Sequence, residues 1–136
     1  MAPPDESSFT LAVYGEDLVP SEVTNLLGLQ PTRSFERGYR RNPTSRPMPH
    51  GAWFFEERGQ PPRDPDDLAR SVLIRFSAAP ETWSRVRELY KVQLRVALQM
   101  ASWNRGFAFS PTTLQLIAAT GAELGFDLYF HESEQE

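Results

Sequence analysis

The best candidates for a functional surface in this sequence are five arginines that lie in one polar stretch. Residues 30–50 hold five arginines, with two aromatic residues and four prolines among them. The charged and aromatic members that we single out are Arg33, Phe35, Arg37, Tyr39, Arg40, Arg41 and Arg46. Arginine and aromatic side chains are enriched at the strongest points of contact between proteins. We therefore predict that this stretch binds a protein partner.

The length of this stretch allows a second interpretation. A long irregular loop inside a compact domain is usually either functional or disordered. If the loop is only a solvated connection, its arginines are expected to pair with residues 1–30, which hold five acidic residues and no basic one. Trp103, in a predicted turn, is a further candidate contact with a partner, whereas Trp53 and Trp83 are predicted to lie in the core.

Signatures of catalysis or metal binding are sparse. Glu56 and Glu57 are neighbours on a predicted strand, so they point to opposite faces and cannot act as a pair. His50 and His131 lack the spacing of metal ligands, and the chain has no cysteine. Helix capping explains a run of three aspartates, Asp64, Asp66 and Asp67. No nucleophile elbow, phosphate-binding loop or zinc-protease motif occurs, so no catalytic residue, metal or cofactor is expected.

One segment fits an RNA-binding pattern. Residues 105–109, Arg-Gly-Phe-Ala-Phe, match the first positions of the motif by which one sheet fold stacks RNA bases on aromatic side chains. However, Ser110 and Pro111 interrupt the strand where the motif should continue, and the chain has a net charge of −4. We therefore predict that Phe107 and Phe109 are core residues, and RNA binding remains an alternative.

The elements that position these residues are organised around Lys91–Ala101. Apolar residues alternate with polar ones here, which predicts a strand with one buried and one solvated face. The stretch is long, so we expect an interior strand of a mainly antiparallel sheet, next to residues 8–14 or 123–130.

Similar patterns predict the other elements. Strands are expected at residues 51–57 and 107–109 as well, and helices after Pro20, Asp64, Pro80 and Ser110. In the last helix, Leu114, Ile117 and Ala118 are expected to face inward. The predicted order β-α-β-α-α-β-β-α-β indicates an α+β two-layer sandwich with helices on one face of the sheet, and the ferredoxin-like arrangement is its nearest common relative.

Length and composition narrow the class of protein. The 136 residues suit one domain, residues 1–136, with termini 1–7 and 132–136 expected to be frayed. Residues 1–6 lack the apolar run of a signal peptide, and no window is apolar enough to span a membrane. We therefore expect a cytoplasmic protein without membrane contacts, and the net acidic charge argues against nucleic acid as a partner.

Four segments together resemble the bacterial family known as domain of unknown function 4279. They are Val13–Leu18, Pro20–Leu29, Pro31–Ser34 with Gly38 close behind, and Leu114–Gly121 followed by Phe126–Tyr129. The family usually has tryptophan in the arginine-rich loop, where this chain has Phe35. The resemblance supplies no agreed activity, but some members are thought to be encoded beside toxin genes, which implies an immunity protein that neutralises a toxin.

Taken together, the residues favour a non-enzymatic module that recognises a protein partner through the arginine-rich loop, and the family resemblance implies that this partner is a bacterial toxin. Two alternatives remain open at this stage: a domain that binds or transforms a small ligand, and an RNA-binding module. The sequence does not indicate the oligomeric state.

Overall fold

The computed structural model describes residue 4 and residues 6–59, 64–76, 79–101 and 106–130. Five strands and four helices form in these ranges. In chain order they are β1 (Glu6–Gly15), α1 (Pro20–Leu27), β2 (Arg33–Phe35), β3 (Gly51–Gly59), α2 (Pro65–Arg75), α3 (Pro80–Leu89), β4 (Lys91–Met100), α4 (Pro111–Thr120) and β5 (Glu123–Phe130).

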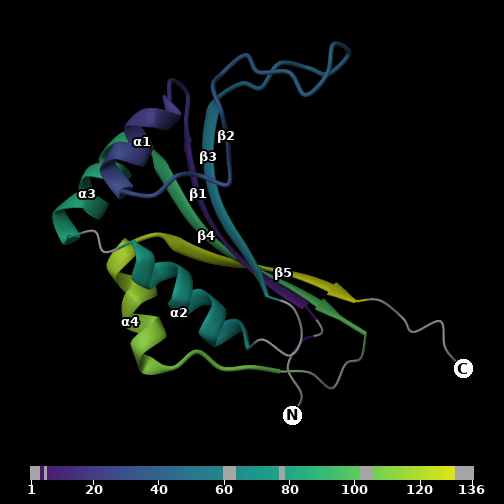
Figure 1. The fold of residues 1–136 in the computed structure, drawn as a ribbon, viewed down its shortest axis with the longest axis vertical. Helices are drawn as coiled ribbons and strands as arrows, with labels where there is room; N and C mark the ends of the chain where they lie inside the picture. Colours follow the sequence, from purple (N-terminus) through teal and green to yellow (C-terminus); the bar gives the residue numbers. More distant parts are fainter. Residues whose placement is uncertain (1–3, 5, 60–63, 77–78, 102–105, 131–136) are drawn as a thin grey trace, which may run out of the picture.

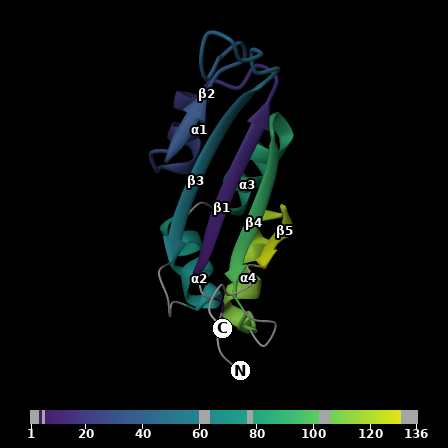
Figure 2. The same cartoon turned by 90° about the vertical axis from the view of Figure 1, so that its right-hand side faces the viewer.

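All five strands join one sheet, in the order β2-β3-β1-β4-β5. Neighbouring strands are antiparallel except β4 and β5, which run parallel and are connected through α4. The four helices cover one face of the sheet and leave the other face open (Figure 1). From the open side the strands lie in front and the helices behind (Figure 2). The predicted α+β sandwich is confirmed, whereas the closer ferredoxin-like relationship stays a prediction.

The core lies between the sheet and the helices. Leu11 on β1 is paired with Phe55 on β3 and with Leu94 on β4, so these side chains point to the same, helix-covered face. The largest fully buried side chains include Trp53, Phe9, Leu11, Leu68 and Leu94. Trp53 and Trp83 are both buried, as predicted. No helix in the described ranges is long and apolar enough to cross a membrane.

The predicted interior strand is confirmed as β4. It lies between β1 and β5, and Val92, Leu94, Val96 and Leu98 are all buried. The helix ends also follow the sequence signals. Asp64 caps α2 by accepting a hydrogen bond from the Asp66 backbone N–H at 3.0 Å. Gly121 ends α4 with a φ of 68°, in the left-handed region that favours glycine.

Three local predictions were wrong. Arg33–Phe35 forms the short strand β2, which pairs with β3 inside the stretch that was expected to be irregular. Residues 107–109 form no strand; Phe107 and Phe109 pack against each other with ring centroids 5.3 Å apart. The observed order is therefore β-α-β-β-α-α-β-α-β.

The third wrong prediction concerns α4, whose inward face differs from the one expected. Leu114 and Ala118 are exposed, whereas Ile117 is buried together with Thr113 and Thr120. The threonines can face inward because they find hydrogen-bond partners there: the Thr120 hydroxyl donates to the Ile117 carbonyl at 2.7 Å. Apolar periodicity cannot reveal a buried face that is partly polar.

Shortening single side chains on the two faces of β4 tests this arrangement. Leu94 is 1% exposed, so Leu94→Ala should lower the free energy of unfolding by about 2–5 kcal/mol through lost burial and the cavity left behind. Gln93→Ala, at the neighbouring position on the open face, should cost less than about 1 kcal/mol. Urea unfolding followed by circular dichroism measures both; equal losses would contradict the assignment of the two faces.

Candidate functional site

The open face of the sheet contains a hollow, which we call the open-face hollow. It has a volume of about 520 Å3. Its floor is made by small side chains on the two central strands: Ser8, Thr10 and Ala12 from β1, and Ala97 from β4. Alternate residues of these strands face the core, so the same pleat produces a packed face and a hollowed one.

Larger side chains from the outer strands form the sides of the hollow. On one side, Phe54, Glu56 and Arg58 of β3 are paired with Ala12, Thr10 and Ser8 of β1. The other side carries Gln93 and Arg95 of β4 with Asp127 and Tyr129 of β5. Tyr14, Thr32 and Arg33 complete the lining toward the end nearest β2. The hollow therefore combines residues from all five strands.

Three arginines line this hollow, and each has a different neighbour. The Nε of Arg95 lies 3.3 Å from an Asp127 carboxylate oxygen, and the Nε of Arg58 lies 3.7 Å from Glu56. Arg33 lies over the ring of Phe54, 4.5 Å from its centroid, which is a cation–π contact. Charges of both signs thus face the hollow, with one more cation than anion among these residues.

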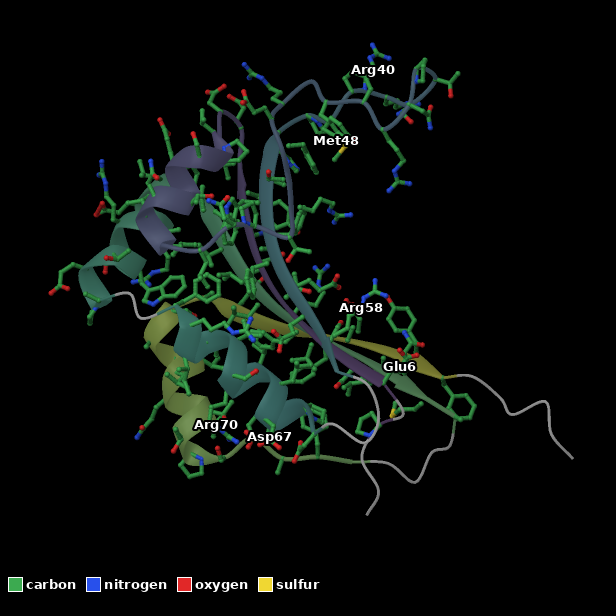
Figure 3. The ribbon with its side chains drawn as sticks, viewed as in Figure 1. Glu6, Arg40, Met48, Arg58, Asp67 and Arg70 are labelled. Carbon is green, nitrogen blue, oxygen red and sulfur yellow. The ribbon has the colours of Figure 1, made fainter. Side chains whose placement is uncertain are left out.

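The second candidate surface is the arginine hairpin, residues 36–50, which projects beyond the end of the sheet (Figure 3). Its two arms are held together by backbone hydrogen bonds: the Gly38 N–H donates to the Met48 carbonyl, and the Met48 N–H to the Tyr39 carbonyl, both at 2.8 Å. At its base Tyr39 stacks on Phe35, with ring centroids 5.4 Å apart. Residues 36–50 form no helix or strand, as expected of a loop, but these contacts pair its two arms as a hairpin.

The five arginines singled out from the sequence do not form one cluster. Arg33 faces the open-face hollow, while Arg37 lies 3.1 Å from Asp17 and 3.9 Å from Glu16. Arg40 donates to the Ser45 carbonyl at 2.9 Å. Arg41 and Arg46 are exposed and make no ion pair with any described residue. Among the described residues, pairing with the acidic N-terminal segment thus applies to Arg37 alone. Trp103 lies outside the described residues.

The glutamates and histidines considered for catalysis or metal binding do not come together in one site. Glu56 and Glu57 point to opposite faces: Glu56 lines the open-face hollow, whereas Glu57 lies 2.7 Å from Arg75 of α2 on the helix-covered side. His50 packs edge-on against Tyr14, with ring centroids 5.6 Å apart. His131 lies outside the described residues. Within the described ranges, no group of three or more histidines and carboxylates is arranged to hold a metal ion.

The aromatic residues of the RNA-like motif lie on the wrong side for base stacking. Phe107 and Phe109 each lie 6.3 Å from the ring of Phe126, and Phe126 is paired with Val96, whose side chain is buried on the helix-covered side. The aromatic residues that face the open side are Tyr14, Phe54 and Tyr129 instead. The two phenylalanines thus belong to the packing around the core, as predicted.

Asp66 is a buried carboxylate with several hydrogen-bond partners, and its role is structural. It accepts hydrogen bonds from the Ser110 N–H at 2.9 Å and from Arg70 at 2.8 Å, so it ties the N-terminal ends of α2 and α4 together. Burial alone would raise the pKa of Asp66, but the hydrogen bonds from Thr113, Ser110 and Arg70, together with the charge of Arg70, outweigh burial and lower it. Helix capping, the role predicted for Asp66 from the sequence, therefore does not account for its contacts with α4.

A protein-family model, Domain of unknown function (DUF4279), matches residues 5–131. The chain belongs to this family. The resemblance inferred from the sequence is thereby confirmed. Searches of curated proteins and of solved structures gave no match.

The DUF4279 family description assigns no activity, so the geometry of this chain is the guide to its function. Sequence analysis found the arginine hairpin but missed the open-face hollow. Its only local signal was the set of small and polar residues that alternate with the core residues of β1 and β4. Which of them meet depends on the pairing of strands that are far apart in the chain.

The lowered pKa of Asp66 predicts a pH dependence of stability. A carboxylate whose pKa is lower in the folded state stabilises the fold above its unfolded pKa of about 4, and this stabilisation is lost as the pH falls through the folded value. Asp66→Asn should therefore lower the free energy of unfolding by about 1–3 kcal/mol at neutral pH. The variant should also weaken the loss of stability between about pH 5 and pH 2.

Asp67→Asn is the matched control. Asp67 pairs with the same arginine, but its side chain is 59% exposed against 12% for Asp66, so its removal should change stability by less than about 1 kcal/mol. Urea unfolding at a series of pH values measures both variants. Equal effects, or an unchanged pH profile for Asp66→Asn, would contradict the role given to Asp66.

Proposed function

We propose that this DUF4279 protein is a non-enzymatic module that recognises a protein partner through the arginine hairpin, residues 36–50. The observation that carries the proposal is a projecting hairpin with a defined backbone and exposed cations at its tip. We further infer that the chain acts as one domain, because its five strands share one sheet.

The order of the hairpin supports a recognition role. Ordering a flexible loop on binding costs free energy, and a loop already held in one conformation avoids much of that cost. Here the two backbone bonds between the arms, the stacking of Tyr39 on Phe35, and the bond from Arg40 to the Ser45 carbonyl hold the conformation. Arg37, paired with Asp17 and Glu16, anchors the base of the hairpin to the turn after β1.

The charge and exposure of the tip indicate the kind of partner. Arg41 and Arg46 are exposed at the tip, and the side of Tyr39 away from Phe35 adds apolar area, since Tyr39 is 50% exposed. The chain as a whole has a net charge of −4. A basic tip on an acidic body speeds the encounter with an acidic surface and disfavours basic ones. We therefore expect an acidic patch on the partner.

A bacterial toxin is the partner class that the family resemblance suggests, and neutralisation in the cytoplasm is the form of recognition that we infer. Enzymatic function is less well supported. The two carboxylates that line the open-face hollow, Glu56 and Asp127, each face an arginine, and the described histidine, His50, packs against Tyr14.

Charge reversal at the tip tests the proposal. The double variant Arg41→Glu/Arg46→Glu should leave the melting temperature nearly unchanged, because neither side chain is bonded to a described residue. It should weaken binding to the partner by about tenfold or more and reduce the salt dependence of the association rate. Affinity capture on the immobilised chain, from a lysate of the source organism with mass spectrometry, identifies the partner; the purified pair then gives the affinities and rates.

Arg85→Glu/Lys91→Glu provides the charge-matched control, because both residues are exposed and lie outside the hairpin. A partner that is retained by the native chain and by this control, but lost with the tip variant, supports the proposal. Equal binding by the tip variant and the control would exclude the hairpin as the contact.

A further inference from the structure

We propose that the open-face hollow is a binding site for a small molecule that carries one acidic group, a carboxylate or a phosphate, and one planar group. This site lies on the sheet and is separate from the tip of the arginine hairpin, so it adds a ligand to the protein partner proposed above. Three features of the hollow support the inference: its shape, the arginine N–H groups that are not hydrogen-bonded to a described residue, and its aromatic side.

The shape of the hollow suits a small molecule. Its volume of about 520 Å3 falls inside the range of roughly 300–1,000 Å3 found for small-molecule sites. The floor residues Ala12 and Ala97 leave room that larger side chains would fill, while Phe54 and Tyr129 rise from the strands on either side. A second hollow of about 280 Å3, next to Glu6, continues it along the sheet.

The arginines of the hollow retain donors for an acidic group. Arg95 and Arg58 each use Nε toward a carboxylate, Asp127 and Glu56 respectively, at 3.3 and 3.7 Å. Their Nη atoms donate no hydrogen bond to a described residue. The Nη edge of a guanidinium is part of the fork that binds a carboxylate or phosphate through two hydrogen bonds. Figure 3 shows Arg58 on the open side of the sheet, away from the helices.

The same contacts indicate that the ligand carries a negative charge. Glu56 and Asp127 already face arginines, so a cationic ligand would have to compete with those pairs for a carboxylate. An anion instead adds to donors that are unused, in a lining with three arginines and two carboxylates. Glu6 lies at the far extension of the hollow, so we place the acidic group nearer Arg33 and Arg95.

The planar group is expected at the side formed by Phe54. The Arg33 guanidinium lies over this ring, and Tyr14 meets the ring edge-on, with centroids 5.7 Å apart. A guanidinium stacked on an aromatic ring presents a second flat surface, on which a planar ligand group can stack. Tyr129, across the hollow and 48% exposed, can contact the opposite end of the ligand.

An NMR titration of the isotope-labelled full chain tests the site, with four probes at constant ionic strength. Benzoate and phenyl phosphate carry both features, acetate lacks the ring, and benzylammonium has the opposite charge. We expect saturable shifts of the Nε–H signals of Arg33, Arg58 and Arg95 and of the Ala97 amide with benzoate, phenyl phosphate or both. Whichever of benzoate and phenyl phosphate binds more tightly identifies the acidic group. Acetate and benzylammonium should bind at least about tenfold more weakly.

Variants locate the site. Arg95→Gln and Arg33→Gln should each weaken binding of the preferred probe by about tenfold, since each removes a charged donor. Ala97→Leu should block the floor and abolish saturation. Arg85→Gln, on α3, is the matched control and should bind as the native chain does. Thermal melts establish that each variant is folded, and the tip variant Arg41→Glu/Arg46→Glu should bind the probe normally.

Several outcomes would overturn the inference. They are the absence of saturable shifts with both benzoate and phenyl phosphate, equal binding of acetate or benzylammonium, and shifts spread over exposed arginines such as Arg41 and Arg85. Normal probe binding by folded Arg95→Gln, Arg33→Gln and Ala97→Leu would also overturn it. Because the hairpin variants leave the hollow intact, failure here is distinguishable from failure of the proposed protein contact.

Discussion

The constraint on which this structure depends is that helices cover only one face of a pleated sheet. Strand β1, at its centre, must satisfy two environments at once: Phe9, Leu11 and Val13 pack under the helices, while alternate residues face the open side. Burial of apolar side chains such as these supplies most of the driving force for folding. The β1 residues on the open side do not have to pack against helices, so small side chains there can leave a hollow without opening a cavity in the core.

Arginine is used in this chain for several different purposes, and its surroundings decide which. Arg70 is held by carboxylates near the junction of two helices, and Arg37 anchors the hairpin to the turn after β1. Arg33 lies flat on an aromatic ring beside the hollow. Arg41 and Arg46 remain exposed at the hairpin tip. Arginines whose donors are satisfied within the fold contribute structure, so the candidate binding residues are those with donors to spare.

The two proposed sites differ in what they require of the fold. The hairpin needs only a rigid base, which β2, β3 and the stacked rings of Phe35 and Tyr39 provide. The hollow needs the register of every strand, because its lining is drawn from all five. Each surface can therefore be altered without the other. A ligand in the hollow would contact Arg33 on β2, the strand that leads into the hairpin, which offers a physical connection between the two sites.

The sequence by itself determined the features that depend on residues close together in the chain. Alternation along residues 91–101 predicted the interior strand, aspartate and proline predicted the start of α2, and the spacing of motifs predicted the family. Tertiary structure alone decided which distant residues meet. It paired Arg37 with Asp17, tied Asp66 to Ser110, turned Thr113 inward, and assembled the hollow from five strands. The physical reason is that periodicity and capping act over a few positions, whereas strand pairing and helix docking join segments tens of residues apart.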